Sequence, residues 1–151
     1  MKEKKCIPVM SKPEPLIPRE LVVGVRERVD QMGRVVWPLD EADFREKLRY
    51  LVDKGVRGFA VCLLFAHLND VHERRLKEII EEEYPDYCLG GMPVVLSSEV
   101  LPKQGEYGRA MSTILNAYLQ QAMSEQLSHV TDQLRTRGYE RSLKIIHNTG
   151  G

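Results

Sequence analysis

Residues 57–65 read RGFAVCLLF, and this nearly unbroken apolar run decides the expected fold. A strand with one face in water alternates apolar and polar residues, whereas a continuous apolar run is typical of a strand covered on both faces. Residues 93–98 (PVVLSS) form a second short run of the same kind. The two runs therefore predict two buried strands.

Helical patterns separate these strands from each other and from the N-terminus. Asp40 is placed as an N-cap, and Lys54-Gly55 supplies the cation and the glycine that commonly end a helix. Residues 70–73 have capping-box spacing and predict the start of a second helix, which ends at the acidic run 81–83. Acidic groups at a helix C-terminus oppose the helix dipole, so this last turn should fray or bind basic side chains.

The remaining segments complete the predicted element order. Two β-like runs within residues 21–37, on either side of a turn at 31–33, predict a β-hairpin. An apolar stripe over about residues 106–137 predicts a long helix that stops at Gly138, and residues 142–147 (SLKIIH) predict a last strand. Strands that alternate with helices indicate an α/β fold with βαβ crossovers and a largely parallel or mixed sheet.

Length and proline content predict the domain organisation. A chain of 151 residues suits one domain with a real core. Residues 1–20 hold four of the eight prolines, which predicts an extended Pro-rich lead-in. Residues 21–151 are then expected to form a single α/β domain.

Composition narrows the possible partners and the compartment. The chain carries 22 basic and 22 acidic residues, so its zero net charge argues against nucleic acid, whose binding needs a basic surface. No apolar run approaches the roughly 20 residues that span a bilayer, so no membrane association is expected. Three widely spaced cysteines indicate reduced thiols in a cytoplasmic protein.

Ser98 and Glu99 lie where the second buried run ends. The carboxyl ends of parallel strands open onto the ligand crevice, so Glu99 could act on a substrate or hold a cation there. Alternatively, Ser98 or Glu99 only satisfies backbone donors ahead of Pro102. Position alone leaves both interpretations open.

Two polar residues of the long helix are further candidates. Arg109 follows Glu106 by three residues, so an ordinary surface ion pair is the favoured interpretation. If Arg109 faces Glu99 instead, it becomes a candidate for binding an anion. Asn116 lies within the apolar stripe, where a buried amide must bond a neighbouring loop or point at a polar site.

The histidines do not predict a metal site. His67 and His72 are five residues apart, whereas two ligands on one helix face need a spacing of four, and no third ligand is evident. His67 is therefore expected in a loop and His72 on the surface of a first helical turn.

Residues 148–151 (NTGG) follow the last predicted strand. Glycines after a buried strand usually serve a tight turn or a close backbone approach to a ligand. We therefore expect the sequence to be a section of a longer polypeptide.

Three stretches carry a family resemblance: residues 60–75 (AVCLLFAHLNDVHERR), 94–118 (VVLSSEVLPKQGEYGRAMSTILNAY) and 143–151 (LKIIHNTGG). Together they resemble the A-type subunit of the hydantoinase/oxoprolinase family, which includes N-methylhydantoinases, 5-oxoprolinases and the acetone and acetophenone carboxylases. Residues 90–93 (GGMP) and the HNTGG ending are most similar to the acetone carboxylase branch. Gly108 stands where the family usually has Glu, which weakens any assignment of a catalytic carboxylate cluster to this helix end.

The resemblance implies a section of a sugar-kinase/Hsp70/actin-type subunit that binds ATP and Mg between two domains. Residues 21–151 would span the end of the hydantoinase A N-terminal domain and the start of the next domain. The phosphate-binding loops of the family would lie outside them, so the chain alone would be inactive. The implied catalytic candidates are Glu99 and Arg109, and the cofactor-binding candidates are Ser98, Asn116, His147, Asn148, Gly150 and Gly151.

Three functions remain open from the sequence. The first is part of an ATP-dependent acetone-carboxylase-like subunit, and the second is part of an ATP-dependent hydantoinase or 5-oxoprolinase that opens a cyclic amide. The third is a non-catalytic module whose long helix docks another subunit. In each case the expected partners are other subunits of a hetero-oligomeric complex.

Overall fold

The computed structural model describes residues 15–85 and 92–144. A short 3-10 turn, η2 (Arg19–Leu21), precedes the first strands. The order of the elements that follow is β1 (Arg28–Val29), β2 (Val35–Trp37), α1 (Glu41–Asp53), β3 (Phe59–Val61), α2 (Val71–Glu83), β4 (Val94–Leu96), α4 (Ser97–Val100) and α5 (Glu106–Thr136). Of the last predicted strand, residues 142–144 are not in a strand and residues 145–147 lie outside the described residues.

The two apolar runs form a parallel pair, as predicted. The expectation that both faces are covered is wrong for β3, because Ala60 is exposed between the buried Phe59 and Val61. Phe59 pairs with Val94 and Val61 with Leu96, and α2 lies in the connection between the two strands. Within the described residues this sheet has only β3 and β4, while β1 and β2 form a separate antiparallel ribbon. The α/β class with a hairpin, a parallel pair and a long helix is therefore confirmed.

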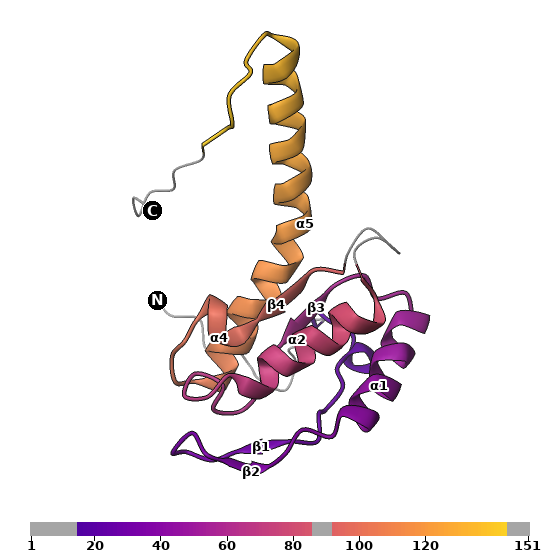
Figure 1. Ribbon diagram of the computed structural model, residues 1–151, viewed down its shortest axis with the longest axis vertical. Helices are drawn as coiled ribbons and strands as arrows, with labels where there is room; N and C mark the ends of the chain where they lie inside the picture. The colour runs from indigo at the N-terminus through magenta and orange to yellow at the C-terminus, as the bar shows by residue number, and fades with distance from the viewer. Residues whose placement is uncertain (1–14, 86–91, 145–151) are drawn as a thin grey trace, which may run out of the picture.

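The core lies between the helices α1 and α2 and the parallel pair (Figure 1). Its most deeply buried apolar side chains are Leu48 of α1, Leu76, Ile79 and Ile80 of α2, and Leu96 of β4. The first turns of α5 contact β3, β4 and α4, and the rest of the helix extends away from the body (Figure 1). No helix in the described ranges is both long and apolar enough to cross a bilayer.

Both α1 and α2 start where the sequence predicts, but only α1 has the predicted side-chain cap. Asp40 caps α1 by accepting the Asp43 N–H at 3.1 Å. The capping box at residues 70–73 is wrong, because the Asp70 carboxylate accepts from Arg74 Nε at 2.7 Å and Glu73 is buried. Asn69 Oδ1 accepts the Val71 N–H at 3.1 Å in its place. The capping-box pattern fails here because the Glu73 carboxylate is hydrogen-bonded to Leu63, Ser97 and Ser98 inside the protein and not to the start of its own helix.

Basic side chains surround the acidic end of α2, as predicted. Arg45 of α1 hydrogen-bonds both Glu82 and Glu83, and Arg75 bonds Glu82 at 2.9 Å. Hydrogen bonds from Arg45, and then from Arg75, hold the pKa of Glu82 below its usual range. The α1–α2 ion network, defined here by Glu41, Arg45, Arg49, Arg75, Glu78, Glu82 and Glu83, therefore joins the two helices along their outer faces.

The predicted hairpin is present with shorter strands. Asp30 Oδ1 accepts the backbone N–H groups of Met32 at 2.8 Å and Arg34 at 2.9 Å, and Gly33 has the positive φ of 76° that the turn requires. Asn69 Nδ2 donates to the Gly33 carbonyl at 2.8 Å, which fixes the turn to the body.

Candidate functional site

A buried polar network lies at the carboxyl ends of β3 and β4. Its members are Glu73 of α2, Ser97 at the start of α4 and Arg109 of α5, and all three are 0% exposed. The parallel pairing of β3 and β4 brings their carboxyl ends to the same edge, and α2 and α5 both begin there. The sheet topology thus collects three polar side chains that are far apart in the sequence.

The Glu73 carboxylate accepts three hydrogen bonds. Its Oε1 accepts from the Leu63 N–H at 2.9 Å and from Ser97 Oγ at 2.6 Å. Its Oε2 accepts from the Ser98 N–H at 2.9 Å. Because a buried carboxylate without donors would be costly, these bonds are what allow Glu73 to occupy an interior position.

Each nitrogen of the Arg109 guanidinium contacts a protein acceptor. Its Nε donates to Ser97 Oγ at 3.0 Å and its Nη2 to the Leu63 carbonyl at 2.6 Å. Its Nη1 lies 3.2 Å from both the Lys103 carbonyl oxygen and His67 Nδ1. Since a guanidinium can only donate, the last contact requires an unprotonated His67 Nδ1.

Ser97 links the two buried charges. Its hydroxyl donates to Glu73 and accepts from Arg109, so the carboxylate and the guanidinium are joined without touching each other. Leu63 is held in the same way, through its N–H by Glu73 and through its carbonyl by Arg109. The network thereby fixes the ends of both strands and the starts of α2 and α5 relative to one another.

The surface ion pair expected between Arg109 and Glu106 is wrong. Arg109 is fully buried, and no hydrogen bond or ion pair joins it to Glu106 or Glu99 in the described part of the chain. The first turns of α5 pack against the sheet, and this directs Arg109 inward. There it donates hydrogen bonds to Ser97 and to backbone carbonyl groups.

Ser98 and Glu99 lie inside the short helix α4, which the sequence did not predict. The Ser98 N–H belongs to the network, while its Oγ is buried and has no hydrogen-bond partner. Glu99 is exposed. The structure therefore brings Ser98 next to the buried network and leaves Glu99 on the surface beside it.

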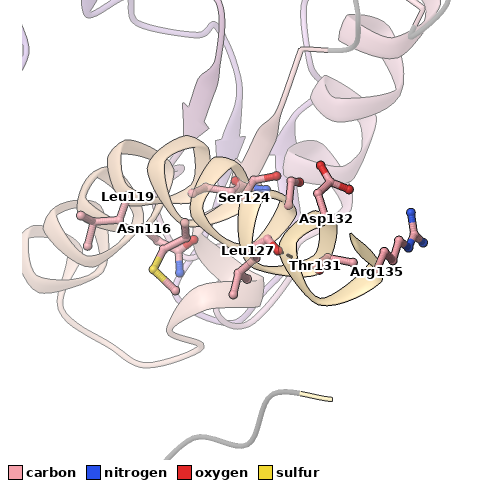
Figure 2. Close-up of a pocket in the computed structure, with 10 residues that line it drawn as sticks. Asn116, Leu119, Ser124, Leu127, Thr131, Asp132 and Arg135 are labelled. Atoms are coloured by element: carbon pink, nitrogen blue, oxygen red, sulfur yellow. Dashed lines mark hydrogen bonds between the residues drawn. The ribbon is translucent and has the colours of Figure 1, made fainter. Parts of the chain in front are cut away.

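The other cofactor-binding candidates are not part of this network. Asn116 lies two turns beyond Arg109, where α5 has left the sheet, so the expected burial of its amide is wrong and its side chain is exposed. It lines a groove of about 750 Å³ along α5 (Figure 2). His147, Asn148, Gly150 and Gly151 lie outside the described residues.

The two histidines occupy different environments. His67 lies in the turn at residues 64–68, as predicted. The surface position expected for His72 is wrong: the residue is only 7% exposed, and its Nδ1 is 2.7 Å from Glu27 Oε2. Glu27, the residue before β1, thus lies against this side chain. Over residues 15–85 and 92–144, no three His, Cys, Asp or Glu side chains are grouped closely enough to hold a metal ion.

Sequence reasoning missed Glu73 and Ser97 as network members. Glu73 precedes Leu76 by three residues and Ile80 by seven, so all three share one helical face. An acidic residue on the apolar face of an amphipathic helix was the available signal. Ser97 gave no comparable signal, because a serine at a strand end is common in any loop.

These elements define a section of an α/β protein with a parallel strand pair clamped by a buried Glu–Ser–Arg network. Residues 3–84 match the hydantoinase/oxoprolinase N-terminal region. The chain belongs to this family, as the sequence resemblance indicated.

Two relatives are named subunits of carboxylases. The chain is 50% identical to the acetophenone carboxylase gamma subunit of Aromatoleum aromaticum over 149 residues, which are 99% of this chain and 20% of that protein. It is 32% identical to the acetone carboxylase beta subunit of Xanthobacter autotrophicus over 91% of this chain and 19% of that protein. The chain therefore spans about a fifth of the length of these relatives.

Two solved structures contain a similar section. The nucleotide-free acetone carboxylase structure matches with a TM-score of 0.75 at 32% identity, over 89% of this chain and 19% of that chain. The ATP-dependent caprolactamase structure from Pseudomonas jessenii matches with a TM-score of 0.80 at 25% identity, over the same fractions.

Proposed function

We propose that this chain is a section of an ATP-dependent carboxylase subunit that acts on a small ketone. The observation that supports this most strongly is the 50% identity to the acetophenone carboxylase gamma subunit over nearly the whole chain. The likeness to acetone carboxylase in both sequence and structure supports the same class of reaction. Because the relatives are about five times as long, the activity belongs to the longer polypeptide and the chain alone is inactive.

The finer architecture is also a proposal. Residues 1–20 would be a lead-in, and residues 21–151 would span the end of one domain and the start of the next in a sugar-kinase/Hsp70/actin-type subunit. A parallel pair of only two strands in the described residues supports this, because such a pair is typical of a larger sheet rather than of an independent one.

The described residues do not fit an ATP–Mg site by themselves. Arg109 is the one buried cation at the strand ends, and its three guanidinium nitrogens are occupied by protein acceptors. We therefore derive no chemical step through the nucleotide from these residues. In the proposed enzyme, ATP and its metal ion would be held by phosphate-binding loops elsewhere in the polypeptide.

The candidate residues take different roles in this proposal. Arg109 is a positioning residue that holds the strand ends through Ser97. Ser98 and Glu99 would border the cleft between domains, since Ser98 Oγ lacks a protein partner and Glu99 is exposed at the same edge. Asn116, His147, Asn148, Gly150 and Gly151 stay cofactor-binding candidates in this proposal, the last four from outside the described residues.

A cyclic-amide hydrolase is the second candidate function. The caprolactamase structure has the higher TM-score of the two structures, and the yeast 5-oxoprolinase is 28% identical over 121 residues. The carboxylase is favoured because sequence identity is much higher for the acetophenone carboxylase subunit than for the caprolactamase alpha subunit, at 50% and 26%.

The partners and the compartment follow from the same relatives. Relatives of this chain are named as gamma, beta and alpha subunits, so we propose that the longer polypeptide assembles with other subunits of a carboxylase complex. Its proposed location is the cytoplasm, in keeping with the unpaired Cys62.

A replacement experiment tests the proposed function. The matching fifth of the Aromatoleum acetophenone carboxylase gamma subunit is replaced by this chain, and ATP-dependent carboxylation of acetophenone is measured in the assembled enzyme. The matched control places this chain in the caprolactamase alpha subunit and measures lactam hydrolysis. The proposal predicts activity in the first chimera and a large loss in the second. A folded carboxylase chimera without activity, beside an active caprolactamase chimera, would favour the hydrolase.

A further inference from the structure

The part of α5 from Asn116 onward has an unusual position for a helix with so many apolar residues. Beyond its contacts with β3 and β4 it extends away from the body of the protein (Figure 1). Leu119 and Met123 are both 54% exposed, and Tyr118 is 70% exposed. Large side chains of this kind, gathered on one element, mark a surface for contact with another part of a protein.

The groove along α5 is formed by one helical face. All ten residues that line it belong to α5, from Asn116 to Arg135, and recur at spacings of three and four (Figure 2). Its apolar lining residues are Leu119, Met123 and Leu127. Val130 and Leu134, which do not line it, follow Met123 and Leu127 in an apolar repeat with spacings of four, three and four. This is the repeat with which one helix packs against another, so the shape and the pattern both fit a helix.

The interior of α5 is also poor in charge. Within residues 110–134 only Glu125 and Asp132 are charged, although charged residues make up 29% of the chain. The groove itself contains two charged residues, Asp132 and Arg135, both at its C-terminal end. A helix that stays in water normally carries many charged residues on its outer faces. Interfaces that form permanently are apolar and depleted of charge, whereas charge serves to steer separate molecules together.

We propose that a helix of the same polypeptide, from outside these 151 residues, covers the groove of α5. This inference rests on the proposed function, in which the chain is a section of a longer subunit. About four-fifths of the acetophenone carboxylase gamma subunit lies outside the matched section, so the relatives contain ample chain to supply such a helix. A tethered helix binds at high effective concentration and needs no charge steering, in keeping with the charge-poor surface.

Hydrogen exchange compares α5 with and without the rest of a subunit. Exchange of the backbone amides of residues 116–134, relative to exchange of the β3 and β4 amides, is followed in two proteins. One is the isolated chain, and the other is the acetophenone carboxylase gamma subunit in which this chain replaces the matching section. The covering helix should slow exchange in the chimera by roughly 100-fold or more, because opening then requires the interface to separate. Equal exchange in a folded chimera and in the isolated chain would overturn the proposal.

A pair of matched variants identifies the surface. Met123→Glu with Leu127→Glu places two charges in the groove and should remove the extra protection. Gln126→Glu with Gln133→Glu adds the same charge at exposed positions of α5 that do not line the groove, and should preserve it. Exchange does not depend on turnover, so an inactive chimera with a protected α5 would contradict the proposed function and leave this inference intact.

Light scattering of the isolated chain gives an independent result. If the occupant is another part of the same polypeptide, the isolated chain is a monomer. A dimer that dissociates in the Met123→Glu, Leu127→Glu variant would show that a second copy occupies the groove, and would overturn the proposal whether or not the chimera folds.

Discussion

Ser97 and Ser98 are adjacent serines with opposite hydrogen-bonding environments. The Ser97 hydroxyl donates to Glu73 and accepts from Arg109, whereas the Ser98 hydroxyl is buried without a partner. The Ser97 hydroxyl therefore contributes hydrogen bonds that stabilise the fold, whereas the Ser98 hydroxyl contributes none. A comparison of Ser97 with Ser98 therefore separates the contribution of the network from the general effect of removing a hydroxyl.

Ser97→Ala should lower the free energy of unfolding by about 1–3 kcal/mol, because it leaves two buried charged groups short of a partner. Ser98→Ala should change it by less than about 0.5 kcal/mol, since no hydrogen bond is lost. Urea unfolding of both variants measures the difference. Equal losses in the two variants would show that Ser97 does not link the buried charges.

The network also shows where single residues escape prediction from the sequence. Arg109 and Glu106 have the spacing of a helical ion pair, and nothing in the spacing indicates that Arg109 turns inward. The inward direction depends on carbonyl groups of Leu63 and Lys103, which only the tertiary fold brings to it. His72 was misplaced for the same reason, because Glu27 approaches it from 45 residues away.

At the scale of elements, two glycines have opposite conformations. Gly33 has a φ of 76° in the hairpin turn, and an added Cβ there would lie 3.5 Å from Leu68 Cβ. Gly108 lies inside α5, and nothing lies within 4 Å of the place a Cβ would take. The hairpin therefore requires its glycine, whereas α5 is weakened by its own.

Gly108→Ala should raise the free energy of unfolding by about 0.5–1 kcal/mol, because alanine has the higher helix propensity. Gly33→Ala should lower it by roughly 1–2 kcal/mol, because an L-residue is strained at this φ. Thermal unfolding followed by circular dichroism measures both changes. Destabilisation by Gly108→Ala would mean that this position of α5 is packed against another group.

Elements with local signals were predicted well. The cap at Asp40, the glycine after α1 and the stop at Gly138 follow from short-range chemistry, and the structure contains all three. The strands were predicted too long, since their ends are set by pairing with a distant partner. The helix α4 was missed because four residues are too few to give a periodic pattern.

At the scale of the whole molecule, the α1–α2 ion network joins two helices across their outer faces. The hydrogen bond from Arg75 lowers the pKa of Glu41, and those from Arg45 and Arg49 lower the pKa of Glu83. A carboxyl group whose pKa is lowered on folding stabilises the protein above its unfolded pKa. That contribution disappears as the pH falls through the lower, folded value.

The melting temperature should therefore be nearly constant from about pH 6 to 8 and fall as the pH drops below the ordinary carboxyl pKa of 4.5. Salt at roughly 0.5 M should weaken this acid dependence by screening these exposed charges. Glu82→Gln should reduce the acid dependence, whereas Glu46→Gln on the exposed face of α1 should leave it unchanged. A pH profile identical in all three proteins would contradict the role of the network.

The family and the overall α/β class could be predicted from the sequence, because each is carried by many residues at once. The position of α5 relative to the body could not, since an apolar stripe indicates that a helix is covered but not by what. The groove along α5 became visible only when the structure showed which of its turns contact the sheet.

Unfolding of the Arg109→Ala variant tests the central claim most directly. If Arg109 holds the strand ends from the interior, its loss leaves Glu73 and Ser97 uncompensated and lowers the free energy of unfolding by about 3–5 kcal/mol. Arg141→Ala, at an exposed position near the end of the described chain, is the control and should change it by less than about 0.5 kcal/mol. An Arg109→Ala variant as stable as the control would contradict the account.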